Sequence, residues 1–101
     1  MKRIIDGKKY DTETAKQVGW SDSHHAHTDF QYHSETLYMK RTGEFFMHGE
    51  GGPMSEYATS NGNMYGWGEK IIPLTLKKAQ QWAEEHLSSE EYESIFGEVA
   101  E

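Results

Sequence analysis

The sequence contains no cysteine, only two prolines and no long apolar run. Without cysteine there is neither a disulfide framework nor a thiolate metal site. No apolar stretch approaches the roughly 18 residues that span a bilayer. The N-terminal pair Ile4-Ile5 is also too short to form the apolar region of a signal peptide. We therefore expect a cytoplasmic protein with no membrane partner.

Positive charge is also scarce, because 10 lysines and arginines stand against 17 aspartates and glutamates, giving a net charge of −7. Binding to phosphate groups requires a basic patch, so direct binding of nucleic acid is not expected. An excess of acid either keeps a protein soluble or matches a basic partner. The composition leaves both interpretations open.

Catalytic motifs are missing as well. Ser55 and Ser60 lack the strand-turn-helix setting of a nucleophile elbow. The glycines between residues 49 and 68 are not followed by the Gly-Lys-Ser/Thr of a phosphate-binding loop. His48-Gly49-Glu50 has the His-x-Glu spacing of zinc deaminases, but that signature also needs a downstream cysteine pair. We therefore expect a non-enzymatic protein.

Turn dipeptides and alternating apolar residues predict antiparallel strands. Asp6-Gly7 signals a two-residue hairpin turn, and Thr42-Gly43 separates two apolar runs. If the second turn has two residues, Met39 pairs with Phe46, whereas a longer loop would shift this register. The predicted strands cover residues 2–5, 8–10, 37–41, 44–48 and 69–73. Loops are expected over 20–28 and over 49–68, the second with a short helix or strand near 55–59.

Capping residues and a 3.6-residue period predict the helices. Thr75 is placed to cap the main helix, whose apolar stripe begins at Leu76 and includes Trp82. Ser88 and Glu91 form the capping box of a short helix that ends at Gly97, and another short helix is expected over 13–18. A chain of 101 residues has room for one domain. The predicted fold of residues 1–101 is α+β: an antiparallel sheet of four to five strands with one main C-terminal helix and short flanking helices.

A histidine-rich segment is the candidate metal site. In an extended chain His25, His27 and Asp29 project to the same side. This spacing can bind zinc if His33 or His48 supplies a further ligand. The alternative is a solvated polar loop. No other cofactor is expected.

Aromatic residues among the glycines are the candidate partner-binding residues. Tyr57, Tyr65 and Trp67 are of the types that dominate protein interfaces, and Glu50 and Glu56 beside them would suit a basic partner. Alternatively, these rings fold back into a small core. The C-terminal glutamates at 84, 85, 90, 91 and 93 are the second choice for a contact surface.

A pattern of segments extends in order over nearly the whole chain: 9–16, 35–38, 42–46, 49–52, 69–75, 79 with 82–84, and 92 with 95–98. This pattern resembles a family of small acidic proteins carried by phages and other mobile elements, similar to anti-CRISPR proteins of the type II inhibitor class. The resemblance implies a protein in the host cytoplasm that inhibits a host defence complex. The expected target is a Cas nuclease whose DNA loading or cleavage is blocked. The alternative function is a small zinc-binding or ligand-binding module with a histidine-rich site.

Overall fold

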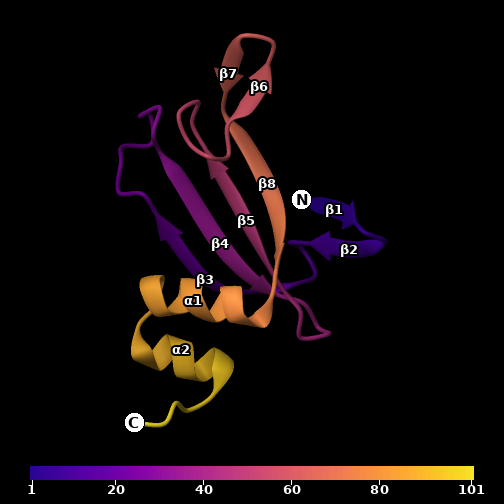
Figure 1. Ribbon diagram of the computed structural model, residues 1–101, viewed down its shortest axis with the longest axis vertical. Helices are drawn as coiled ribbons and strands as arrows, with labels where there is room; N and C mark the ends of the chain where they lie inside the picture. The colour runs from indigo at the N-terminus through magenta and orange to yellow at the C-terminus, as the bar shows by residue number, and fades with distance from the viewer.

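In the computed structural model, which describes residues 1–101, a four-stranded antiparallel sheet with the order β3-β4-β5-β8 forms the centre of the fold (Figure 1). Two hairpins, β1–β2 and β6–β7, extend from it, and α1 and α2 follow β8 at one end of the sheet. The α+β class and the four-stranded antiparallel sheet are therefore confirmed. The bounds are β1 (Lys2–Ile5), β2 (Lys8–Asp11), β3 (Lys16–Asp22), β4 (His33–Met39), β5 (Phe45–Gly51), β6 (Thr59–Asn61), β7 (Met64–Gly66), β8 (Gly68–Leu74), α1 (Leu76–His86) and α2 (Ser89–Phe96).

Each face of the sheet has its own hydrophobic cluster, because successive strand residues point to opposite faces. Phe45 and Met47 of β5 pack with Leu37 of β4 and Ala79 of α1. Phe46 lies between them in sequence and packs on the other face, together with Tyr10 of β2 and Ile71 of β8. One strand thus connects the helical layer to the β1–β2 hairpin.

The helix ends match their sequence signals. Thr75 Oγ1 accepts a hydrogen bond of 3.1 Å from the Lys78 backbone N–H. Ser88 and Glu91 bond reciprocally, side chain to backbone N–H, as in a capping box. Gly97 ends α2 with φ at 92°, a conformation that favours glycine.

The predicted helix over residues 13–18 is wrong. Residues 12–15 form a turn, and β3 begins at Lys16 and continues through Asp22, three residues into the expected loop. The apolar spacing of Ala15 and Val18 fits a helix, but a bulge between Gln17 and Gly19 lets Val18 contact the core from a strand. No local signal reveals this pairing with β4.

The β4–β5 connection is a three-residue loop over 41–43, so the register predicted for a two-residue turn is wrong by one position. Lys40 donates its backbone N–H to Glu44 O at 2.8 Å, and Gly43 has φ at 91°. Met39 consequently pairs with Phe45 and not with Phe46. A glycine with positive φ at the third loop position is typical of such hairpins.

The segment 49–68 is more ordered than the long loop expected there. β5 continues to Gly51, β8 begins at Gly68, and these two glycines pair across the sheet. The β6–β7 hairpin occupies residues 59–66 and turns at Gly62, which has φ at 63°. Four glycines of the segment are buried, namely 49, 51, 52 and 68. They are sites of close packing, where a Cβ atom would collide with a neighbour.

Candidate functional site

Tyr57 is buried, with 2% of its surface exposed, so the expectation of an exposed ring is wrong. Its ring lies over Gly49 of β5, where only the missing side chain leaves room for it. Its hydroxyl donates to Glu35 Oε2, and Trp82 Nε1 donates to Glu35 Oε1 at 2.9 Å. Burial, and then the bond to the Glu35 carboxylate, raise the pKa of Tyr57 well above its usual value. Tyr57 therefore ties the loop over 52–58 to β4 and, through Glu35, to α1.

Three rings stack where the loop over 23–32 meets β7 and β8. Tyr32 is 6% exposed and stacks on Trp67 with ring centroids 5.7 Å apart and planes 15° apart. His27 lies against both, at 4.5 Å from Tyr32 and 5.6 Å from Trp67. Backbone bonds from Gly52 N to Tyr32 O and from Met54 N to Phe30 O, both 2.8 Å, join this loop to the loop over 52–58. The stack thus holds Trp67 in a defined orientation.

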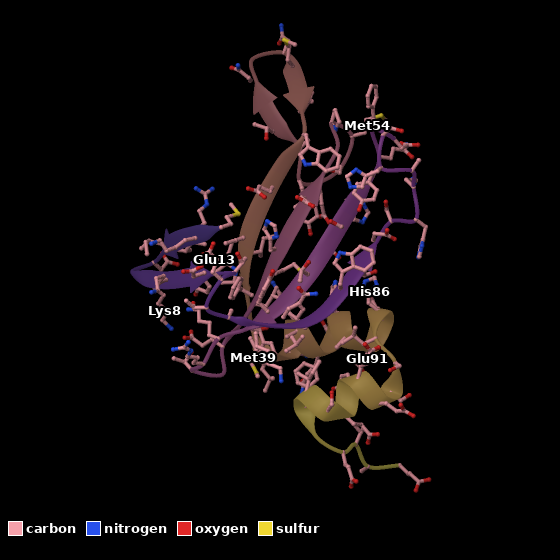
Figure 2. The ribbon with its side chains drawn as sticks, turned by 180° about the vertical axis from the view of Figure 1, so that it is seen from behind. Lys8, Glu13, Met39, Met54, His86 and Glu91 are labelled. Atoms are coloured by element: carbon pink, nitrogen blue, oxygen red, sulfur yellow. The ribbon has the colours of Figure 1, made fainter.

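Large apolar side chains are exposed at this end of the molecule, the end from which β6 and β7 project in Figure 1. Figure 2, seen from behind, labels Met54 at the same end. Phe30 and Met54 also line one hollow of about 420 Å³. We call this surface the aromatic tip. Its exposed fractions are Phe30 64%, Met54 65%, Met64 75%, Tyr65 66% and Trp67 44%.

The aromatic tip contains two of the three predicted aromatic contact residues, Tyr65 and Trp67. Sequence reasoning missed Phe30, Met54 and Met64, although a methionine beside Tyr65 in a polar hairpin was a usable signal. Several large apolar side chains exposed at one end of a molecule indicate a candidate interaction site, whereas single exposed apolar residues are ordinary.

Charge is distributed unevenly around the aromatic tip. No lysine or arginine occurs in residues 17–39 or 42–69, which supply all of the aromatic tip. Glu56 is exposed in the loop over 52–58, and Glu50 is half-buried on β5, directly opposite Glu69 of β8. The ten cations lie in β1, β2, the start of β3, the β4–β5 loop, β8 and the first turn of α1. The aromatic tip is therefore an apolar surface with acidic neighbours, and the segments that form it contain no lysine or arginine.

The predicted metal ligands are not brought together. No group of three or more His, Asp or Glu side chains is placed to hold a metal ion. His27 is in the ring stack, Asp29 Oδ1 accepts from Gln31 N at 2.7 Å, and the His33 ring lies 6.4 Å from that of Tyr57. His25 is half-buried. The zinc site stays a prediction, which elemental analysis of untagged protein tests.

A serine–histidine pair connects β3 to the end of α1. Ser21 Oγ lies 3.1 Å from His86 Nδ1. The carboxylate nearest the other ring nitrogen belongs to Glu85, at 3.8 Å and with 76% of its side chain exposed. A general base oriented for nucleophilic catalysis needs that third group within hydrogen-bond distance. The Ser21–His86 pair is therefore interpreted as a structural contact between β3 and the end of α1.

The chain matches no protein-family model, and no curated protein or solved structure shows significant similarity to it. Neither of its helices has the length and apolar character needed to cross a membrane.

Proposed function

We propose that this protein is a non-enzymatic inhibitor that binds a basic surface of a host defence complex, a Cas nuclease, through the aromatic tip. The observation that carries the proposal is the exposure of five large apolar side chains at one end of the molecule, on segments that contain no lysine or arginine. Catalysis is not needed for this role, because occupying a surface is enough to block it.

The aromatic tip has the features of a binding hot spot. Tyrosine and tryptophan contribute most to interface energies, and preorganised side chains lose less entropy on binding. Trp67 is stacked on the buried Tyr32 before any partner arrives. Tyr65 lies on β7, opposite Ser60 of β6, so its backbone position is also defined.

Charge supports the choice of partner. CRISPR effectors hold guide and target nucleic acid in positively charged channels. The acidic neighbours of the aromatic tip would be attracted to the rim of such a channel, and this attraction should weaken as salt rises. A protein seated there would obstruct DNA loading or the movement that precedes cleavage. The resemblance to small phage proteins similar to anti-CRISPR proteins agrees with this target.

The test is a cleavage assay with a purified Cas nuclease, guide RNA and target DNA, with this protein in excess. Wild-type protein should inhibit, and the double variant Tyr65→Ala/Trp67→Ala should not. Trp20→Ala is the matched control, because Trp20 is 52% exposed but lies on β3, outside the aromatic tip. The control should inhibit like the wild type.

Two results would refute the proposal in different ways. Uninhibited cleavage with several effector types, together with no complex in gel filtration, would remove the Cas nuclease as the target. Inhibition that persists in the double variant would instead move the contact away from the aromatic tip. The acidic C-terminal surface of α1 and α2 would then be tested next.

A further inference from the structure

The outer edge of β8 is an unpaired sheet edge. β8 bonds to β5 along its whole length, Gly68–Leu74, without a register shift, and no strand pairs with its other side. The opposite edge of the sheet, β3, is interrupted by the bulge between Gln17 and Gly19. Bulges protect sheet edges against pairing with other chains, and β8 has none.

The hydrogen-bond pattern shows which backbone groups point outward. The bond from Lys40 N to Glu44 O makes that pair hydrogen-bonded, and bonded pairs alternate along an antiparallel ladder. The even-numbered residues of β5 therefore bond to β4, and its odd-numbered residues bond to β8 at residues 68, 70, 72 and 74. The N–H and C=O groups of Glu69 and Ile71 consequently point away from the sheet, as does the nitrogen of Pro73, which has no hydrogen to donate.

The available part of this edge is short and has a definite end. Pro73 cannot donate a hydrogen bond, so pairing must stop before it. The β1–β2 hairpin leaves the sheet sideways near this point, as Figure 1 shows. The open edge therefore runs from Gly68 to Ile72, enough for a segment of about four or five residues at the usual rise of a strand.

A crevice of about 670 Å³ lies in the corner between β8 and β1, lined by residues 2–5 and 70–72. Four of these residues are isoleucines, and the other three are Lys2, Arg3 and Lys70. No acidic residue lines the crevice. The nearest carboxylate along β8, that of Glu69, lies 3.0 Å from His48 Nε2. The crevice is thus apolar and cationic in a protein that is acidic as a whole.

We propose that β8 binds an extended peptide by strand addition, and that the peptide carries alternating apolar and acidic side chains. The outward N–H and C=O groups of Glu69 and Ile71 would bond to the peptide backbone. Its apolar side chains would contact the isoleucines, and its carboxylates would approach Lys2, Arg3 and Lys70. A second copy of this chain is the poorer occupant, since two β8 edges would bring two sets of these cations together. The proposal is independent of the aromatic tip.

The probe is a fluorescein-labelled seven-residue peptide of alternating valine and glutamate, capped at both ends, with binding followed by fluorescence anisotropy. The same peptide with lysine in place of glutamate should bind at least about tenfold more weakly. Two further peptides carry N-methyl groups on alternate backbone nitrogens, one at the odd positions and the other at the even positions. One of these two peptides should no longer bind, and the other should bind like the unmethylated peptide. This pattern requires a strand that bonds along one side only.

The matched protein variants are Glu69→Pro and Glu69→Ala. Both remove the carboxylate, but only proline removes the outward N–H, and neither touches a bond to β5. Proline should weaken binding by about tenfold relative to alanine. Hydrogen exchange should show that the peptide slows the amides of Glu69 and Ile71 in the wild type.

Equal binding of both methylated frames, or of the glutamate and lysine peptides, would overturn the proposal even if Glu69→Pro failed to fold. A dimer in gel filtration that the peptide does not dissociate would assign the edge to a second copy, which also overturns it.

Discussion

Replacing Gly49 with alanine should remove Tyr57 from its buried position. The new Cβ atom would overlap the Tyr57 ring at Cζ, Cε1 and Cε2, in the rigid middle of β5. Neither the strand nor the ring has room to yield, because β5 is bonded on both sides and Tyr57 is 2% exposed. The ring must therefore leave, and its hydroxyl then no longer reaches Glu35.

The cost follows from what the ring loses. Exposing a large apolar side chain costs about 2 kcal/mol. Leaving the partly buried Glu35 oxygen without its partner costs about 1–3 kcal/mol more. The expected loss in the free energy of unfolding is thus about 3–5 kcal/mol, a large part of the total of about 5–15 kcal/mol typical of a domain.

Urea denaturation followed by circular dichroism measures this loss. Gly66→Ala is the matched control, since a Cβ there meets nothing within 4 Å. It should change stability by less than about 1 kcal/mol. In a Tyr57→Ala background the space over residue 49 is empty, so Gly49→Ala should then cost almost nothing. An equal cost of Gly49→Ala in that background and in the wild type would show that the Tyr57 ring is not what the new Cβ atom displaces.

Three further predictions concern turns and caps. Ser88→Ala removes the acceptor for the Glu91 backbone N–H and should lower the free energy of unfolding by about 1 kcal/mol in urea melts, whereas Ser89→Ala should not. The Ser88 backbone N–H, and then its hydroxyl, hold the pKa of Glu91 below its usual value. The stabilisation of α2 by the ionised Glu91 is therefore complete above the unfolded-state pKa of this residue and is lost as pH falls through its folded-state pKa. Helicity from circular dichroism should therefore fall in acid, and less so in Glu91→Gln. Gly43→Ala should lower the melting temperature, because φ at 91° costs a side chain about 1 kcal/mol or more; an unchanged value would argue against the three-residue loop.

Local signals predicted much of the fold because they act over a few residues. The Asp6-Gly7 turn and the Thr75 and Ser88 caps each combine a residue type with a backbone conformation that needs it. The strand at 16–22 was missed for the opposite reason. Its partner, β4, begins eleven residues after β3 ends, and nothing in the spacing of Ala15 and Val18 distinguishes a bulged strand from a helical turn.

In the candidate site, too, the features that depend on neighbouring residues were predictable and those that depend on distant residues were not. Tyr65 and Trp67 are exposed, which fits the contact surface and not the alternative of rings folded back into a small core. Tyr57 has similar neighbours in sequence, yet it is buried because Gly49 on another element leaves space for its ring and Glu35 accepts its hydroxyl. These partners are 8 and 22 positions away, beyond the reach of composition or periodicity. The gathering of Phe30 and Met54 likewise depends on the backbone bonds between two loops.

The one-sided placement of the ten cations gives the molecule an electric dipole moment that its net charge of −7 does not describe. Residues 79–101 contain seven glutamates and no lysine or arginine, while β1 and β2 alone contain four cations. In the field of a charged partner such a molecule experiences a torque before it makes contact. A cationic surface would turn it to present the side away from the β1–β2 hairpin, whereas a polyanion would turn it to present that hairpin. Orientation during encounter would thus be selected by the sign of the partner's charge, and the selection would fade once salt shortens the screening length below the size of the protein.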